Sequence, residues 1–436
     1  MIGLIDCNNF FVSCERLFRP DLQTKPVAVL SSNDGCIVAR SQEVKKLGIP
    51  MGVPYFQIKN MCKKENITIF SSNFQLYRDI SSRIMQVLKE EVQNIEVYSI
   101  DEAFFNVHSS VTEKEMAEMR MRVMQKTGIP VSIGVAHTKT RAKIANNIAK
   151  HRKHDGRLTM SDMEDGEGGR QEHEEGVCIL DMTMWENIKN TLPCGNVWGI
   201  GRQTTAFLAS EKIETVGQLL ACDRAFIKQS LGVVGERLCM ELSGTSVDRV
   251  GDSVHTQESY TSTRSFGTTI RDKQTLMSAL SYHTTHLAEK LRAQSEVASK
   301  ISIVLQGSRY GAFSHREGIL STTLVMPTND TIALIHEAQK LLIKLYDSEI
   351  PYKKAGIILS GILREEVTSR SLFDDHNTHE NRRVLNTVTD TINKKFGART
   401  LHSGVLYATE KWKENKRLVS KEYTTKWSEI CTVKAI

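Results

Sequence analysis

Long hydrophobic runs are missing from this 436-residue chain. No stretch of about 18 uninterrupted apolar residues occurs, so a membrane-spanning helix is not expected. The nine cysteines include no CxxC pair, so neither a zinc site nor a redox motif is indicated. Scattered, unpaired cysteines suit a reducing compartment, and we expect a cytoplasmic protein. The first residues also lack the basic leader of a secretory signal, so none is expected.

The chain has no acidic excess either. Its net charge is +6 and its pI is about 8.7. This mild basic balance is compatible with binding a polyanion such as nucleic acid, but it does not identify the ligand. Hydrophobic residues make up 40% and charged residues 25%, which is typical of a globular protein. The length exceeds one ordinary core, so we expect about two to four domains, and we find no internal repeat.

Residues 1–150 carry an α/β pattern. The first strand ends at Asp6, and Asn8 or Asn9 is expected to cap the helix that follows. Thr138 or Thr140 is expected to cap a basic helix over residues 141–150. Hydrophobic periodicity predicts further strands at residues 25–30, 95–100 and 131–136, and further helices at residues 41–47, with Gly48 at the carboxyl end, and 73–92.

Three carboxylates stand at expected strand ends. Asp6 follows the first strand, and Asp101 and Glu102 form the tip of a hairpin between residues 95–100 and 103–107. Carboxylate oxygens are the hard ligands that Mg²⁺ prefers, and two such ions can stabilise the attacking and leaving oxygens of a phosphoryl transfer. The pattern therefore suggests a two-metal site. Capping or surface roles remain the alternative, because acids are common at strand ends.

Basic residues accompany these acids. The helix after Asp6 directs its amino-terminal N–H groups toward the same end of the strand, which is a potential anion site for a triphosphate. Lys45, Arg141, Lys143 and Lys150 lie on two further expected helices. The alternative explanation for these cations is a solvated helix face.

The remaining sequence divides into four parts. Residues 161–175 hold seven acidic residues against one arginine, which indicates a solvated linker. Gly199 and Gly201, followed by Arg202, fit a helix-hairpin-helix in which backbone N–H groups approach a DNA phosphate. From residue 259, the order β-α-β-β-α-β predicts a split βαβ domain. The last seventy residues are polar, and we expect them to be partly extended.

Several short motifs occur in a fixed order: DCNNFF at 6–11, YSIDEAF at 98–104, IGVA at 133–136, AKIAN at 142–146, VWGIG at 197–201 and RSFG at 264–267. Together they resemble Y-family translesion DNA polymerases over residues 1–365. LSSNDGC at 30–36, FSSN at 70–73 and YTTKW at 423–427 resemble the UmuC-type branch, the catalytic subunits of bacterial DNA polymerase V. This likeness extends over nearly the whole chain.

The resemblance implies an α/β, more strictly α+β, multidomain fold with the shape of a right hand. A palm would comprise residues 1–19 and 76–160, and small fingers residues 20–75. The acidic linker at 161–175 would lead to a helical thumb at 176–245. A little finger of split βαβ type would span 255–365, and a carboxyl-terminal tail 366–436.

The resemblance also implies roles for individual residues. Asp6 and Asp101 would bind both of two Mg²⁺ ions, Glu102 the catalytic one, and the Cys7 carbonyl would be a further ligand. Phe11 would be the steric gate that excludes a ribose 2′-hydroxyl. The triphosphate would be held by Lys45, Lys150 and the backbone of Phe10 and Phe11, and DNA would be bound by Gly199, Gly201 and Arg202.

The implied function is error-prone, template-directed translesion synthesis in the DNA damage (SOS) response of a bacterium. The substrates would be primed DNA template and dNTPs, and no membrane is expected as a partner. A UmuD′-type dimer and a RecA filament are expected partners, with the protein at the nucleoid when active. Residues 369–373 resemble the peptide that docks on the sliding clamp, with Leu372 and Phe373 as anchors; a buried turn is the alternative.

Two other functions remain open at this point. A nucleotidyl cyclase or two-metal nuclease could use a similar palm, but a cyclase has no need of a helix-hairpin-helix or a second α/β domain. A non-catalytic DNA-binding or clamp-recruited scaffold would not need all three acids. Small fingers close less surface on the nascent base pair, and no second set of acids suggests a proofreading exonuclease, so low fidelity is the expectation.

Overall fold

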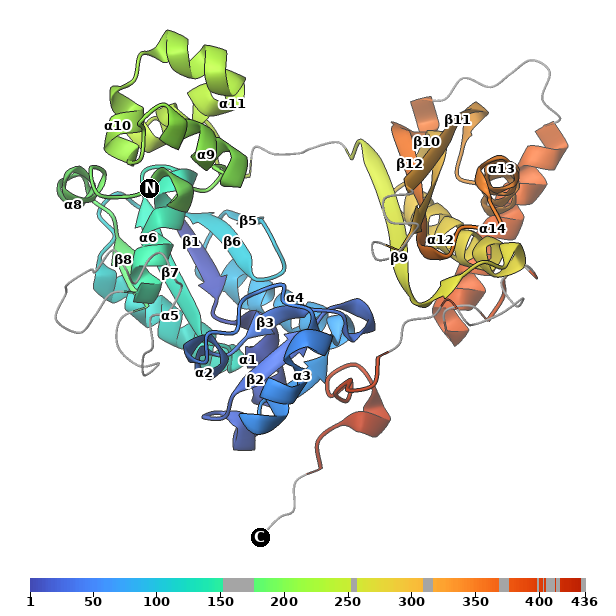
Figure 1. Cartoon of the computed structure of the whole chain (residues 1–436), viewed down its shortest axis with the longest axis horizontal. Coiled ribbons are helices and arrows are strands. Elements are labelled where there is room, and N and C mark those ends of the chain that lie inside the picture. The colour runs from blue at the N-terminus through green and yellow to red at the C-terminus, as the bar shows by residue number, and fades with distance from the viewer. Residues whose placement is uncertain are drawn as a thin grey trace. The chain divides into compact units, whose positions relative to one another are not determined.

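The computed structural model describes residues 1–151, 176–251, 257–308, 317–367, 376–397, 400–402, 404, 412 and 416–432. The chain divides into two compact units (Figure 1). Unit 1 comprises Met1–Val254 together with Arg417–Ile436, and unit 2 comprises His255–Lys416. Over these described ranges, no helix combines the length and the apolar character that crossing a bilayer requires.

A five-stranded sheet lies at the centre of unit 1. Its order is β5-β6-β1-β7-β8, with the bounds β1 (Ile2–Cys7), β5 (Ile95–Val97), β6 (Glu102–Asn106), β7 (Val131–Ala136) and β8 (Val177–Ile179). Strand β1 pairs antiparallel with both β6 and β7, and β8 pairs parallel with β7. All six residues of β1 are buried, because this strand is central and apolar cores cover both of its faces.

Alternate residues of β1 face these two cores. Ile5 and Cys7 contribute to a core shared with α1 (Phe10–Leu17), α4 (Phe74–Glu91) and α5 (Glu113–Thr127). Ile2 and Leu4 contribute to the other core, which includes α6 (Lys139–His151). Because side chains alternate along a strand, Asp6 lies on the same side as Leu4, the side that α6 covers.

A second, three-stranded sheet of order β3-β2-β4 forms between α1 and α4 in the sequence. Its elements are β2 (Val27–Leu30), β3 (Ile37–Arg40), α2 (Gln42–Lys46), α3 (Tyr55–Lys64) and β4 (Thr68–Ser71). It has a small apolar core of its own. The Ser41 side chain caps α2 by accepting from the N–H of Val44, and Gly48 follows that helix with φ of 70°, the left-handed geometry predicted for it.

Four helices complete the amino-terminal part of unit 1: α8 (Met182–Ile188), α9 (Arg202–Ser210), α10 (Val216–Ala221) and α11 (Arg224–Ser243). Side chains of Asp181, Thr215 and Asp223 cap α8, α10 and α11. Their apolar residues extend the core that lies under α6, with Trp185 almost fully buried. The helices are therefore fixed to the α6 side of the five-stranded sheet.

Unit 2 has the β-α-β-β-α-β order predicted from the sequence, which confirms the split βαβ fold. The elements are β9 (Ser259–Ile270), α12 (Lys273–Ala293), β10 (Glu296–Gly307), β11 (Glu317–Thr328), α13 (Thr331–Leu345) and β12 (Tyr352–Arg364). The sheet order is β11-β10-β12-β9 with antiparallel neighbours, and both helices pack on it through one continuous core. Asp272 and Asp330 cap the two helices.

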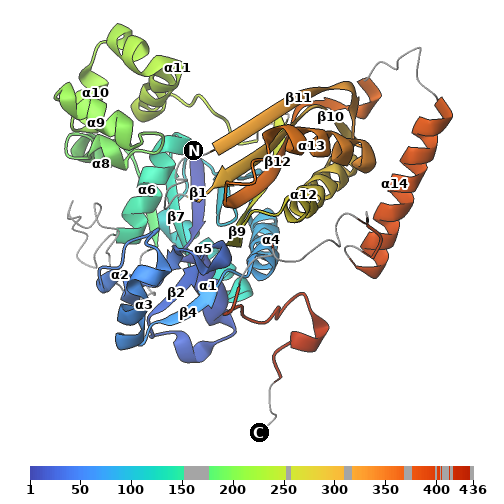
Figure 2. The ribbon, with the colours of Figure 1, turned by 45° about the vertical axis from the view of Figure 1, so that its right-hand side comes forward.

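The expectation of a partly extended tail is wrong where the tail forms a helix. Residues His376–Phe396 form a helix, α14, which is held to unit 2 by polar contacts: Arg292 pairs with Asp390 at 2.6 Å, and Asn386 donates to Asp330 at 2.9 Å. Residues 417–432, hereafter the terminal segment, lie against the three-stranded sheet and α4 of unit 1. Figures 1 and 2 draw this segment in red beside the blue elements of that sheet.

The prediction that Asn8 or Asn9 caps α1 is also wrong. Neither asparagine caps this helix, because Asn9 adopts a left-handed backbone with φ of 47° and its side chain makes no capping hydrogen bond. The Asn8 side chain is engaged elsewhere, where its Oδ1 accepts from Ser132 Oγ at 2.8 Å. Helices α3 and α5 were not predicted, although Thr112 and Glu115 form a capping box at the start of α5.

Candidate active site

Asp6 and Glu102 lie directly opposite each other on neighbouring strands. Asp6 of β1 is in register with Glu102 of β6 on one side and with Ser132 of β7 on the other. Glu102 lies on the same face as Phe104, which belongs to the core under α6, so both carboxylates point toward that helix. Strand alternation thus brings together two acids that are nearly one hundred positions apart in the sequence.

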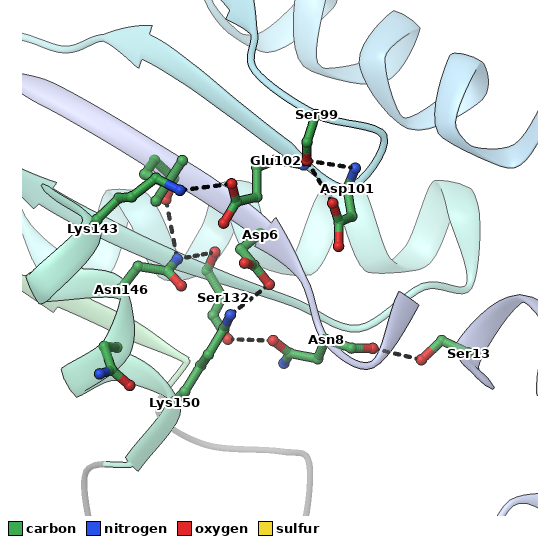
Figure 3. Close-up of polar contacts among 12 residues, drawn as sticks. Asp6, Asn8, Ser13, Ser99, Asp101, Glu102, Ser132, Lys143, Asn146 and Lys150 are labelled. Atoms are coloured by element: carbon green, nitrogen blue, oxygen red, sulfur yellow. Dashed lines mark hydrogen bonds and ion pairs between the residues drawn. The ribbon is translucent and has the colours of Figure 1, made fainter. Parts of the chain in front are cut away.

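Two lysines of α6 complete this cluster, as Figure 3 shows. Lys150 Nζ lies 2.6 Å from Asp6 Oδ1, and Lys143 Nζ lies 2.8 Å from Glu102 Oε2. A spacing of seven residues places two side chains on one face of a helix, because it corresponds to nearly two turns. Each carboxylate is therefore paired with its own ammonium group, and the negative charge of the pair is balanced.

Asp101 lies in the turn before β6, and its carboxylate is bound by Ser99 and not by a lysine of α6. Its Oδ1 accepts a hydrogen bond from Ser99 Oγ at 2.5 Å, and Ser99 Oγ also accepts from the N–H of Glu102 at 3.0 Å. The Asp101 carbonyl accepts from the N–H of Cys7 at 2.9 Å, which joins the turn to the end of β1. Of the three predicted acids, the structure thus brings two face to face and holds the third beside them by its backbone.

The pKa of Asp6 is raised to about 6, chiefly by burial; Lys150 lowers this pKa, and the nearby Glu102 carboxylate also raises it. Asp6 is only 9% exposed, so little water is available to solvate its charge. Burial disfavours the ionised form of this carboxylate, so a nearby positive charge stabilises it. Such an environment favours binding of a cation.

A cavity of about 270 Å³ lies over the two acids. Its lining includes Asp6, Glu102, both lysines and Asn196. The side-chain nitrogen Nδ2 of Asn196 is buried and has no hydrogen-bond partner among the described residues. An unpaired buried donor beside two carboxylates indicates a cavity that accommodates a polar ligand.

The donor set fits a hard divalent cation. All three side chains are carboxylates, and the Cys7 backbone lies at the same strand end. Over the described residues, however, no three Asp, Glu, His or Cys side chains converge into a ready cation cage. The reason is that Lys150, Lys143 and Ser99 each engage one of the three acids.

A further cationic group adjoins the acids. The pKa of Lys45 is lowered by burial and by the positive charges of Arg40 and Lys150, and Asp6 acts in the opposite direction. These effects show that Lys45 is within electrostatic range of Lys150 and Asp6. The two lysines predicted to hold a triphosphate come from different helices, α2 and α6.

Arg141 has a different environment from the other α6 cations. It is 2% exposed, donates to the Leu242 carbonyl at 2.7 and 2.9 Å, and stacks over Trp185 at 4.3 Å. The solvated-face alternative is wrong for this residue, because its guanidinium ties α6 to the end of α11. Its role is structural.

Phe11 lies in an aromatic cluster at the start of α1. Its ring stacks on Tyr77 with centroids 4.6 Å apart and an interplanar angle of 15°, and it meets Phe74 edge-on at 5.8 Å. Phe10 is buried, whereas Phe11 is partly exposed. The Phe11 ring is thus supported by α4 while part of its surface remains accessible.

Glu15, one turn beyond Phe11, is fully buried, and burial raises its pKa to about 7. Because 7 is above the carboxyl's ordinary value of 4.5, folding favours the protonated form. The resulting stability is complete below pH 4.5 and is lost as the pH rises through 7. The free energy of unfolding should therefore fall, by up to about 1.4 kcal/mol per pH unit, across this window.

Glu15→Gln should remove this contribution, since the amide oxygen can still accept from Tyr77 and Ser420. The measurement is the thermal unfolding midpoint of wild type and variant at about pH 5 and about pH 8. We expect the variant to lose less stability than wild type between the two conditions. An identical loss in both proteins would contradict the raised pKa.

The predicted phosphate-binding hairpin precedes α9. Gly199 has φ of 94°, Gly199, Gly201 and Arg202 are exposed, and a Cβ placed on either glycine would meet nothing within 4 Å. Adjacent Trp198 contacts Tyr98 edge-on at 5.5 Å. The backbone here is open to an approaching phosphate, as the sequence suggested.

Lys143 was named only among the basic residues of its helix, and Asn196 and Trp198 were not predicted as parts of the site. Lys143 Nζ also lies over the Tyr98 and Trp198 rings, at 4.4 and 5.0 Å from their centroids. The seven-residue spacing of Lys143 and Lys150 was the available signal for the first. The other two depend on how the segment before α9 packs on the sheet, which sequence periodicity does not reveal.

Two predictions lie outside the described residues. These are the acidic linker at 161–175 and the clamp-docking peptide with Leu372 and Phe373.

Family models match three parts of the chain. Residues 5–147 match the impB/mucB/samB family, residues 257–372 match the carboxyl-terminal domain of that family, and residues 383–433 match a domain of unknown function. The first match contains all three predicted acids, and the third contains the whole terminal segment.

Curated proteins match over the full length. The chain is 33% identical to "Protein UmuC" of Salmonella typhimurium over 441 residues, covering 100% of both chains. It is 32% identical to "Protein MucB" of Escherichia coli, with 99% of both covered. It is 24% identical to "DNA polymerase IV 1" of Bacillus subtilis, with 96% of both covered.

Solved structures share the fold. A Y-family DNA polymerase chimera of Dbh and Dpo4 matches with a TM-score of 0.65 and 19% identity, covering 83% of this chain and 99% of that one. An insertion ternary complex of Dbh DNA polymerase matches over the same shares with a TM-score of 0.54 and 19% identity.

Proposed function

The chain belongs to the impB/mucB/samB family and is a UmuC-like Y-family translesion DNA polymerase, and we propose that it joins nucleotides by two-metal-ion transfer at Asp6, Asp101 and Glu102. The observation that carries the metal assignment is the opposition of Asp6 and Glu102 at one end of the central sheet, beneath two lysines. Further support comes from the raised pKa of Asp6 and from the cavity above it.

In this proposal, Asp6 and Asp101 ligate both Mg²⁺ ions, Glu102 ligates the catalytic ion, and the Cys7 carbonyl is a further ligand. When bound, the ions supply charge stabilisation for the attacking and leaving oxygens. Lys143 and Lys150 would neutralise the charge of Glu102 and Asp6 in the absence of the ions, because each acid has a cationic partner. Lys150 and Lys45 then hold the triphosphate with the backbone of Phe10 and Phe11.

The same proposal gives Phe11 the role of sugar gate. Its ring would fill the space that a ribose 2′-hydroxyl needs, and its support by Tyr77 favours this role. Gly199, Gly201 and Arg202 would bind a backbone phosphate of the primed template through exposed N–H groups and a cationic side chain. The little finger, residues 255–365, would hold the duplex.

Lesion bypass can be tested by primer extension on a template with one abasic site, beside an undamaged template. We expect extension past the abasic position, because the small three-stranded sheet of the fingers offers little surface with which to enforce base-pair shape. A matched replicative polymerase provides the reference. A stall equal to that of the reference enzyme would refute lesion bypass, and conversion of dNTPs to cyclic nucleotides and pyrophosphate without any primed template would indicate a cyclase.

We further propose that the protein works in the bacterial SOS response, in the cytoplasm and at the nucleoid. The support is its similarity to UmuC and MucB along the whole chain. A UmuD′-type dimer, a RecA filament and the sliding clamp are the proposed partners, the last through Leu372 and Phe373. Primer extension with and without each purified partner would test these assignments.

A further inference from the structure

The terminal segment is joined to the three-stranded sheet by backbone contacts. The N–H of Ser71 donates to the Leu418 carbonyl at 2.9 Å, and the N–H of Leu418 donates to Ser71 Oγ at 3.0 Å. A parallel bridge pairs Ser71 with Val419, at the end of β4. The segment therefore continues the hydrogen bonding of the sheet beyond its edge strand.

Asn73 binds the same segment with the other end of its side chain. Its Oδ1 caps α4 by accepting from Leu76 N at 3.2 Å. Its Nδ2 lies 3.2 Å from the Ser420 carbonyl, 3.1 Å from Ser420 Oγ and 3.3 Å from the Lys421 carbonyl. One buried amide thus fixes both the start of α4 and the path of the terminal segment.

A buried chain of contacts leads from Ser420 to Phe11. Ser420 Oγ donates to Glu15 Oε1 at 3.0 Å, and Tyr77 Oη donates to the same oxygen at 2.6 Å. The Tyr77 ring stacks against Phe11. Glu15 and Tyr77 are both fully buried, and Glu15 Oε2 has no hydrogen-bond partner among the described residues. The orientation of this carboxyl therefore depends on the two hydroxyl groups that share its other oxygen.

A second contact holds the far end of α1. The Tyr423 ring stacks on Phe18 with centroids 4.5 Å apart and an interplanar angle of 12°. Phe18 directly follows the helix that carries Phe11 and Glu15. The terminal segment thus contacts the end of α1 through Tyr423 and the start of α4 through Ser420, and these two helices carry Phe11 and the ring that supports it.

We propose that the terminal segment is a positioning element for the sugar gate. Ser420 holds Glu15, which binds Tyr77, and Tyr423 holds the end of α1. Together they keep the Phe11 ring from moving aside when a ribose 2′-hydroxyl contacts it. Steric exclusion requires a rigid obstacle, because a ring that can shift aside excludes nothing. The inference rests on the proposed role of Phe11, and it assigns a task to part of the domain of unknown function at residues 383–433.

The test uses the full-length protein and measures kcat/KM for a dNTP and for the matching rNTP on one primed template. Ser420→Ala removes the hydroxyl that Glu15 and Asn73 share, and Tyr423→Ala removes the ring on Phe18. Tyr423→Phe keeps that ring and is the conservative variant. Trp427→Ala, at a residue that is 90% exposed on the same segment, is the matched control.

We expect the dNTP-to-rNTP ratio to fall about fivefold in Ser420→Ala, the factor that corresponds to one ordinary hydrogen bond. Tyr423→Ala should lower the ratio comparably, whereas Tyr423→Phe and Trp427→Ala should keep it. Hydrogen exchange at the Ser71 amide should accelerate in Tyr423→Ala if the segment loosens.

Two results would overturn the inference. In the first, the ratio is unchanged in Ser420→Ala and Tyr423→Ala while Phe11→Ala, in the same assay, loses discrimination. In the second, both nucleotides lose rate equally, which would make the segment a general support for the fold. If Phe11→Ala itself retains discrimination, the gate assignment fails instead, so the two proposals fail in different ways.

Discussion

Replacing Asp6 by asparagine is expected to lower the rate of nucleotide incorporation by roughly a thousandfold or more. Loss of a metal ligand removes several kcal/mol of transition-state stabilisation, and each 1.36 kcal/mol corresponds to a factor of ten in rate. Asn keeps the shape of Asp but presents a neutral, weaker ligand. Single-nucleotide primer extension in Mg²⁺ measures the effect, and fluorescence anisotropy with labelled primer–template measures DNA binding, which should persist.

The stability of this variant separates a chemical defect from misfolding. The pKa of Asp6 is raised to about 6 by burial, so above that pH the folded state holds a carboxylate that it disfavours. Asp6→Asn removes this penalty, and the unfolding temperature should stay level or rise. Lys150, about a third exposed, can be solvated without its partner.

Asp79→Asn is the matched control, because that partly exposed carboxylate pairs only with Arg83 across one turn of α4 in the part of the chain that the structure describes. It should retain full activity. An Asp6→Asn protein that keeps more than about a tenth of the wild-type rate would contradict the assignment of Asp6 as a metal ligand.

Phe11→Ala should admit ribonucleotides, with the dNTP-to-rNTP ratio of kcat/KM falling about 100-fold or more. Phe11 is partly exposed above its stack on Tyr77, so truncation opens space at the surface and leaves the core of unit 1 intact. The dNTP rate should change much less than the rNTP rate.

Phe11→Tyr tests whether ring size is the cause, since it keeps the steric bulk and should keep exclusion. Phe56→Ala truncates a phenylalanine that is 71% exposed on α3 and should have no effect on the ratio. Unchanged discrimination in Phe11→Ala would remove the gate from the proposed mechanism and would leave the metal assignment standing.

Local periodicity was sufficient to predict most of the elements. The hydrophobic spacing of α4 and α13, and the β-branched runs of β7 and β12, are local signals that tertiary packing reinforces. The acids were predicted because strand ends are recognisable. Their pairing with Lys143 and Lys150 was harder to foresee, because it depends on α6 crossing over the end of β1.

The terminal segment was missed for a different reason. Its contacts join Ser420 to Asn73 and Glu15, which are separated from it by hundreds of residues, and it contains no regular element long enough to show a period. Helix α14 was missed because its described side chains pack through polar groups such as Asn386 and Asp390, and a polar sequence resembles an extended tail. In both cases tertiary contacts supply what local composition does not contain.

Unit 1 is formed by two chain segments that are separated by the whole of unit 2, and this arrangement affects the order in which its contacts form during folding. Synthesis proceeds from the amino terminus, and the contact between Asn73 and Ser420 closes a loop of 347 residues. The whole of unit 2 emerges from the ribosome before that loop can close. Contacts of such long range form late, since loop entropy must be overcome first. Unit 1 therefore remains without the bridge from Ser71 to Val419, and Glu15 without one of its two hydroxyl donors, until residues 418–420 have emerged.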